Sequence, residues 1–215
     1  MTRLRDQRLE GRLTKLGPNT GVLQCPRYGA HITLDGGMDG VTLRLLGKDR
    51  ITGYEVFLLG VPSVDAIPVR LPRAGHRFVC LLAMDARALS VDAISSMAKK
   101  LLDAGCVYFC CWGPDCERVH DVIDEVIVGE GVTPIAWSGV MTTWHDKEPL
   151  KEAAEFFLWA AAPDDAHVEH CFSGIAIRVG NEFDVVELEL EVTTLLNNPP
   201  SNPPLNRTAR MRATG

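Results

Sequence analysis

A thiol and two imidazoles between residues 116 and 145 are the side chains best suited to chemistry in this sequence. Cys116 follows the turn residues Gly113-Pro114-Asp115. We therefore expect it in the first turn of a helix, where free N–H groups and the helix dipole favour a thiolate. His120 lies one helical turn further on, and His145 follows a later predicted strand. The pattern predicts Cys116 as a nucleophile with His145 or His120 as its base. A small first-turn residue beside a solvated histidine is the alternative interpretation.

Metal binding is a second interpretation of the same region. Cysteine and histidine donors occur in two groups, Cys111, Cys116 and His120, then His167, His170 and Cys171. Zinc sites usually contain closely spaced donor pairs such as Cys-x-x-Cys, and this sequence contains no such pair. It also contains neither a GxGxxG nor a GxxxxGK[ST] motif. We therefore predict no metal and no cofactor.

Five residues are candidates for binding a polar ligand because they follow, or lie near, the ends of predicted parallel strands. Ligands in open α/β sheets bind outside the carboxyl ends of the strands, which bring loops together at one edge. The capping of helices alone would also place Asp and Thr at such positions. The candidates are Asp85, Trp112, Asp115, Thr143 and Trp144.

Residues 77–196 alternate between strand and helix patterns, and we assign them to one α/β domain. Continuous apolar runs predict buried strands, and apolar residues at spacings of three and four predict helices. Residues 183–196 fit either pattern, and we favour a helix because it completes the alternation. The fold class is therefore α/β, a small parallel Rossmann-like or flavodoxin-like sheet with helices on both faces. The predicted strands are 78–84, 106–112, 133–140 and 172–179, and an extension of the third to Thr143 stays open. The other predicted helices begin after Ser90, after Asp115 and at Glu148, the last running to Ala162.

Residues 1–72 have a different, β-rich character and form the preceding module in our interpretation. Five or six short runs separated by turn residues predict a small barrel. The runs GRLTKL, NTGVLQC, GAHITLD, ITGYEVFLL and AIPVRL resemble those of an OB-type or cold-shock barrel, which implies nucleic-acid binding through stacked aromatic residues. The second and third runs instead hold Leu23, Cys25, His31 and Ile32. We therefore favour a structural module that supports or dimerises the α/β domain.

The ends of the chain and its composition complete the prediction. A Pro- and Asn-rich, then basic tail at 197–215 predicts disorder. The net charge of −6 argues against general binding of nucleic acid or acidic membranes. No apolar run reaches the roughly 20 residues of a membrane span, and the N-terminus lacks the apolar segment of a secretory signal. Seven cysteines, several inside apolar runs, predict reduced thiols and a cytoplasmic protein.

Three stretches carry a family resemblance. CCWGPDCERVHD, TTWHDKEPLKEAAEFFLWAA and FVCLLAMD resemble an uncharacterised bacterial family known only as a domain of unknown function, over about residues 77–180. The resemblance implies a bacterial, cytosolic α/β domain and supplies no activity.

These observations favour a ligand- or partner-binding accessory module with a polar site at the carboxyl edge of its sheet. Its partner would be an unknown protein or a small polar ligand, and homo-oligomers are compatible with the sequence. The enzyme alternative is a small hydrolase or transferase that uses Cys116. The third alternative is nucleic-acid binding through the N-terminal module.

Overall fold

A seven-stranded sheet organises the described part of the chain. The computed structural model describes residues 31–32, 43–71, 77–129, 134–181 and 185–201. The strands lie in the order β1-β2-β3-β7-β4-β5-β6. The strands β3, β7, β4, β5 and β6 are parallel to one another, whereas the pairs β1–β2 and β2–β3 are antiparallel. They are β1 (His31–Ile32), β2 (Leu43–Lys48), β3 (Glu55–Val61), β4 (Arg77–Ala83), β5 (Cys106–Trp112), β6 (Met141–His145) and β7 (Cys171–Val179).

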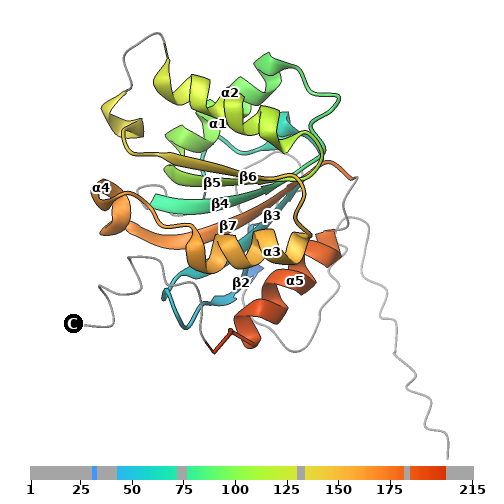
Figure 1. Ribbon diagram of the computed structural model, residues 1–215, viewed down its shortest axis with the longest axis vertical. Helices are drawn as coiled ribbons and strands as arrows, with labels where there is room; N and C mark the ends of the chain where they lie inside the picture. Colours follow the sequence, from blue (N-terminus) through green and yellow to red (C-terminus); the bar gives the residue numbers. More distant parts are fainter. Residues whose placement is uncertain (1–30, 33–42, 72–76, 130–133, 182–184, 202–215) are drawn as a thin grey trace, which may run out of the picture.

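Helices cover both faces of this sheet (Figure 1). The helices α1 (Val91–Asp103) and α2 (Cys116–Val128) pack on one face. The other face carries α3 (Leu150–Glu155), its π-helical continuation η3 (Phe156–Ala160), and α5 (Val185–Asn197). The short elements are η1 (Val64–Ala66), η2 (Ile135–Trp137) and α4 (Asp165–Val168). The predicted α/β fold class is confirmed.

The central strands owe their position to side chains that are apolar on both faces. The first six residues of β5 are all buried, and their side chains divide between two apolar cores, one under α1 and α2 and one under α3 and α5. Such strands are stable only when helices shield both faces, which is why the continuous apolar runs were recognisable in the sequence. None of the described helices combines the length and the apolar composition that crossing a membrane requires.

The ends of the first helix follow the expected capping chemistry. The Ser90 hydroxyl accepts a hydrogen bond from the Ala93 N–H at 3.2 Å and caps α1. Gly105 follows the last turn with a φ of 104°, a conformation that glycine adopts without steric cost. The helix predicted from Ser90 is confirmed, as are the strand at 106–112 and the helix at 185–197.

The strand predicted over 133–140 is wrong within the described residues 134–140. Residues 135–137 form the 3-10 turn η2, and Gly139 adopts a φ of 75° that ends the extended chain. The strand lies at 141–145 instead, and it is the edge strand of the sheet. An edge strand is only half covered, so β6 tolerates the polar sequence MTTWH, in which the apolar signal of a buried strand is absent.

The predicted helix over 148–162 is shorter at its start and changes character along its length. It begins at Leu150 after Pro149 and becomes π-helical over Phe156–Ala160. The extra residue in each π-helical turn re-aims the side chains that follow. Phe156, at the start of this segment, packs against His145, and Trp159 further along reaches the buried Asp49 with its indole N–H at 3.3 Å.

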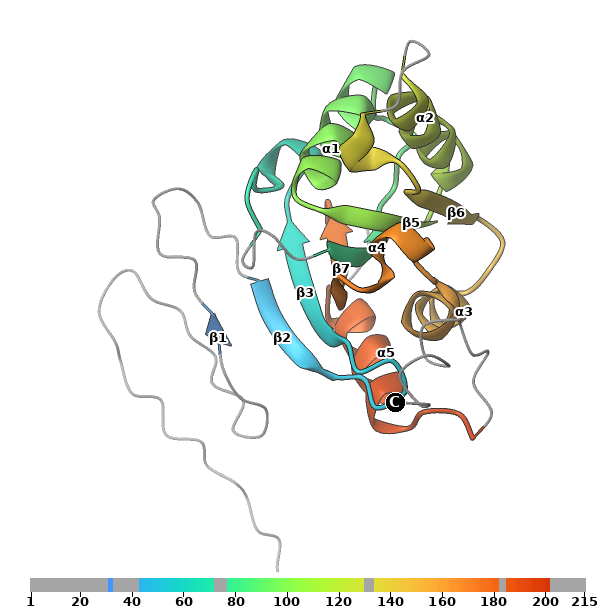
Figure 2. The ribbon, with the colours of Figure 1, turned by 90° about the vertical axis from the view of Figure 1, so that its left-hand side faces the viewer.

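The strands β2 and β3 belong to the same sheet as the α/β domain, although the sequence suggested a separate module over residues 1–72. Along its whole length β3 pairs in parallel with β7, and β2 pairs with β3 on the side of the sheet far from β6 (Figure 2). Residues 64–66 form η1 rather than starting a strand. The predictions for residues 1–30 and 33–42, and for the tail at 202–215, lie outside the described residues.

Buried Asp49 joins the β2–β3 hairpin to η3 through hydrogen bonds. Its carboxylate accepts hydrogen bonds from the N–H and the hydroxyl of Thr52, at 2.7 and 2.5 Å, besides the bond from Trp159. A buried carboxylate is costly unless several donors satisfy it. Here the donors come from the hairpin turn and from η3, so they hold two distant parts of the sequence together.

A close approach between β7 and η3 gives a test of this packing. A Cβ added to Gly174 would lie 2.8 Å from Cζ of the buried Phe157 ring. We expect Gly174→Ala to lower the free energy of unfolding by about 1–3 kcal/mol in urea denaturation, because overpacking forces the ring to move. Gly60→Ala is the matched control, since its added Cβ meets nothing closer than 3.5 Å. Combining Gly174→Ala with Phe157→Leu should recover part of the loss. Equal stability of Gly174→Ala and the unaltered chain would contradict the packing.

Candidate functional site

The topology of the sheet predicts a ligand site at the carboxyl ends of β5 and β6. The chain leaves β5 toward α2 on one face of the sheet and leaves β6 toward α3 on the other. Neighbouring loops that diverge in this way open a crevice at the end of the strands, where ligands bind in open α/β sheets. The candidate residues from the sequence lie around these two strand ends.

Side-chain alternation in β6 divides the candidates between the two faces. Thr143 pairs with Cys110, Trp144 with Cys111 and His145 with Trp112. Cys111 belongs to the core under α1 and α2, whereas Cys110 belongs to the core under α3. Paired residues in a sheet point to the same face. Trp144 therefore lies on the α2 side, and Thr143 and His145 lie on the α3 side.

The structure does not bring the Cys116 thiol to the His145 imidazole. Cys116 is 1% exposed and belongs to the core under α1 and α2, on the opposite face from the His145 side chain. Burial raises the pKa of the Cys116 thiol, and the hydrogen bond from the His145 backbone N–H only partly opposes this. A buried thiol with a raised pKa lacks the properties of a nucleophile.

His145 instead lies in a hydrogen-bonded chain on the α3 side. Its Nδ1 lies 2.6 Å from Glu148 Oε2, and its Nε2 lies 3.2 Å from Thr143 Oγ1. When Nδ1 donates to the carboxylate, Nε2 is the acceptor nitrogen, and the Thr143 hydroxyl can donate to it or to the Phe109 carbonyl oxygen at 3.4 Å. The Phe156 ring packs against the imidazole, with ring centroids 4.8 Å apart. The imidazole itself is 5% exposed, whereas the Glu148 side chain is 44% exposed, so the solvent-facing end of this chain is the carboxylate.

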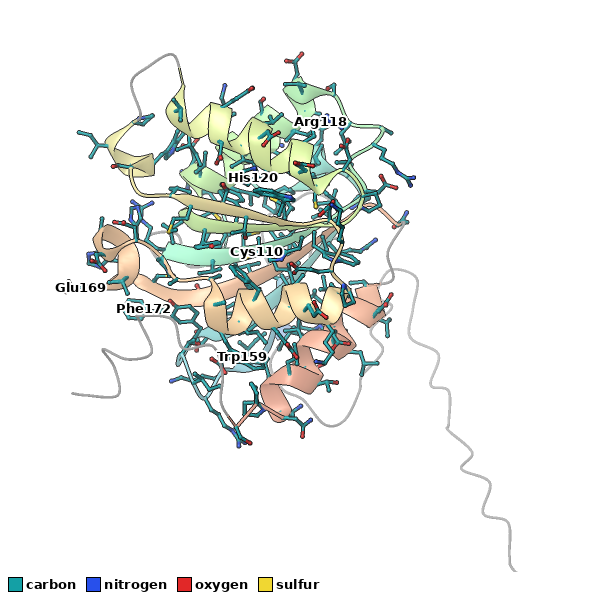
Figure 3. All side chains as sticks on the ribbon, viewed as in Figure 1. Cys110, Arg118, His120, Trp159, Glu169 and Phe172 are labelled. Atoms are coloured by element: carbon teal, nitrogen blue, oxygen red, sulfur yellow. The ribbon has the colours of Figure 1, made fainter. Side chains whose placement is uncertain are left out.

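His120 lies on the α2 side and contacts Trp144 rather than Cys116. His120 lies between α2 and β6 (Figure 3). The centroids of its imidazole ring and the Trp144 indole ring lie 4.5 Å apart, at an angle of 57°. Nδ1 of His120 lies 3.0 Å from Asp121, and Nε2 lies 3.5 Å from Asp124. The hydroxyl of Thr142 donates to Asp124 at 2.6 Å. Side chains of α2 and β6 thus form one continuous polar and aromatic surface.

Asp115 holds a loop together and does not cap α2 through its side chain. The residue occupies the N-cap position with a φ of 65° in the left-handed region, and its carboxylate accepts from Arg118 Nε at 2.7 Å. The same guanidinium donates to the carbonyl oxygens of Leu89 and Ala86, at 3.2 and 2.5 Å. Arg118 therefore joins the loop after β4 to the turn after β5. The sequence analysis missed it, although its spacing of three from Asp115 was visible.

Asp85 and Trp112 also have structural partners at this edge. Asp85 forms a bidentate ion pair with Arg87, whose side-chain and backbone hydrogen bonds lower the pKa of the Asp85 carboxyl. The Trp112 indole N–H donates to the Glu148 carbonyl oxygen at 2.9 Å and so joins the end of β5 to the loop after β6. Of the predicted ligand residues, Asp85, Trp112 and Asp115 thus all form hydrogen bonds within or between the loops at this edge.

The donors considered for zinc lie apart from one another. Cys111, Cys116 and Cys171 are buried in the apolar cores, and His167 Nε2 contacts the Ser138 carbonyl oxygen at 2.6 Å. Within the described ranges no three Cys, His, Asp or Glu side chains lie close enough together to share a metal ion.

A comparison with protein families matches residues 60–182 to a model described as a domain of unknown function (DUF7684). The match covers more than half of the 215 residues and runs from the end of β3 through β7. It confirms the resemblance to an uncharacterised family. No curated protein and no solved structure matches the chain.

The burial of Cys116 leads to a test of its reactivity. We expect iodoacetamide to label Cys116 in the folded protein far more slowly than a model thiol at the same pH, because the thiol is shielded and its pKa is raised. Unfolding in guanidinium should remove the difference. The rate is read by peptide mass spectrometry in a Cys25→Ser background, since Cys25 lies outside the described residues. Rapid labelling of folded Cys116 near neutral pH would restore the nucleophile hypothesis.

Proposed function

The chain belongs to the family described as a domain of unknown function (DUF7684), and we propose that it is a partner-binding accessory module. Its docking site is the β6 edge surface, which we define as His120, Asp121 and Asp124 of α2 together with Thr142 and Trp144 of β6. The bacterial origin and the cytoplasmic location stay predictions from the sequence.

The exposed indole of Trp144 is the observation that carries this proposal. Trp144 is 44% exposed although tryptophan is among the costliest side chains to leave in water. Its ring packs against His120, which itself is held by Asp121 and Asp124. An aromatic side chain fixed in one orientation loses little entropy on binding, and such residues dominate the energetics of protein interfaces.

The open edge of β6 supports the same conclusion. Among the described strands only β5 pairs with β6, so alternate N–H and C=O groups of β6 point away from the sheet. Edge strands are commonly protected from pairing by lysine, proline or a bulge. The sequence MTTWH contains neither lysine nor proline, and its pairing with β5 is regular throughout.

A small polar ligand in the loops is less well supported. Asp85 and Asp115 form ion pairs with Arg87 and Arg118, and the Trp112 N–H bonds to the Glu148 carbonyl oxygen. A ligand there would have to replace bonds that hold the loops together. Nucleic-acid binding through residues 1–72 stays a prediction, because most of the residues proposed for it lie outside the described ranges.

Site-specific photo-crosslinking tests the partner-binding function. A photoreactive residue at the exposed Met141, at the start of the edge strand β6, should give a discrete protein adduct in cells that carry the gene. The same group at Val186, which is exposed on α5, is the control and should give none. Trp144→Ala should reduce the adduct at position 141 several-fold. Equal adducts from both positions, or an adduct that Trp144→Ala leaves unchanged, would contradict the proposal.

An enzyme is the second candidate, and the chain Thr143–His145–Glu148 is the observation that favours it. It keeps His145 as the base of the predicted hydrolase or transferase and replaces Cys116 by Thr143 as the nucleophile. Thr143 Oγ1 would attack the acyl carbon of an ester while its proton passes to His145 Nε2 and then to the leaving alcohol. Water deprotonated by Nε2 would then release the acid and restore the hydroxyl.

Acylation by p-nitrophenyl acetate tests this second candidate. The expected result is an acetyl group on Thr143, found by peptide mass spectrometry, and hydrolysis that falls about a hundredfold or more in Thr143→Val and His145→Asn. Thr142→Val is the matched control, because Thr142 lies next to Thr143 but on the opposite face of β6. Loss of hydrolysis in the control, or the absence of an acetyl group on Thr143, would exclude a threonine nucleophile.

A further inference from the structure

The chemistry of the β6 edge surface indicates what kind of partner it takes, if the proposed function holds. We propose that an extended segment of the partner, with basic residues at alternate positions, pairs with β6 and continues the sheet. A basic side chain of this segment lies over the Trp144 ring, between it and the carboxylates of α2. The inference rests on the proposed partner-binding function and adds the conformation and the charge of the bound segment.

The sheet edge fixes the conformation of the bound segment. The backbone groups of β6 that point away from β5 repeat at every second residue, which is the pattern that an extended strand satisfies. Side chains of an added strand alternate between the faces of the sheet. Every second residue of the segment therefore lies on the α2 side, next to Thr142 and Trp144.

The carboxylates of α2 set the charge of those residues. The side chains of Asp121 and Asp124 are 65% and 48% exposed, and each contacts His120. No lysine or arginine in the described part of the chain forms an ion pair with either carboxylate. Arg118, the cation on the same helix, donates its hydrogen bonds to Asp115, Ala86 and Leu89 instead. The negative charge on this side of β6 is therefore left for a partner.

The indole adds a second reason for a cation. A guanidinium or ammonium group within about 6 Å of an indole face is attracted by the negative π surface of the ring. Trp144 contacts His120 on one side and leaves much of its surface exposed. The guanidinium group of an arginine over this ring would stack on the indole and donate hydrogen bonds to the Asp121 carboxylate at the same time, because the group is planar and carries several N–H donors.

The same charges disfavour a second copy of this chain as the occupant. Antiparallel pairing of β6 with β6 of another copy, about a twofold axis normal to the sheet, would set α2 opposite α2. Asp121 and Asp124 of the two copies would then repel one another across the seam. A basic segment has the complementary charge.

Peptide titration of the full chain tests charge and alternation. The probe is a capped heptapeptide of alternating arginine and threonine, and its control has the same composition with the four arginines in one block. We expect the alternating peptide to bind at least about fivefold tighter, with NMR shifts centred on β6. Trp144→Ala should weaken it about fivefold to tenfold. Asp121→Asn should weaken the binding of the alternating peptide and reduce its salt dependence. Glu187→Gln, at an exposed position of α5, should leave this binding unchanged. Equal binding of the two peptides would overturn the inference.

N-methylated peptides test pairing with the backbone of β6. One version is methylated at every arginine nitrogen of the main chain and the other at every threonine nitrogen. Strand pairing predicts that one version loses binding and the other keeps it, because only alternate N–H groups face β6. Binding by both versions would overturn strand pairing. A photo-adduct at position 141 without binding of the alternating peptide would overturn the inference but leave the proposed function, whereas the absence of that adduct overturns the proposed function itself.

Discussion

Successive side chains of a strand point to opposite faces of the sheet, and in β6 this geometric constraint decides which polar residues can meet. Thr143 and His145 join Glu148 and Phe156 on one face. Trp144 joins His120 on the other. Two small constellations result where a single cluster was expected. Their chemistry differs: one contains the buried His145 imidazole and is arranged for proton transfer, and the other contains the exposed Trp144 indole and is arranged for contact.

The elements that were predictable from the sequence are those with a strong apolar signal and a defined cap. The helix after Ser90 met both conditions and the strand at 106–112 had the apolar signal, so their positions followed from burial and, for the helix, from capping. β6 met neither, because an edge strand can be polar. The place of β2 and β3 in the main sheet was not predictable either, since it depends on β7, more than 100 residues further along the chain.

The candidate site was predictable in its location but not in its pairing. The rule that ligands bind at the carboxyl ends of parallel strands placed Asp115, Cys116 and His145 near one edge of the sheet. To decide which side chains touch, the first residue of β6 must be known exactly. An error of one residue in this position reverses the face on which every side chain of the strand lies. Glu148, which orients His145, was visible at a spacing of three but looked like part of a helix start.

The register between β4 and β5 has a consequence for how this chain can change. Phe78 pairs with Cys106 but Val79 pairs with Tyr108, so β5 contains one residue more than its neighbour at this point. Val107 and Tyr108 both join the α3-side core, and the side chains that follow alternate between the two cores. A deletion of a single codon here would remove the extra residue and leave Cys111 and Trp112 on their present faces, because Phe78–Cys106 and Val79–Tyr108 would then be consecutive pairs. β5 can therefore lose one residue at this point without changing which helix each of them meets.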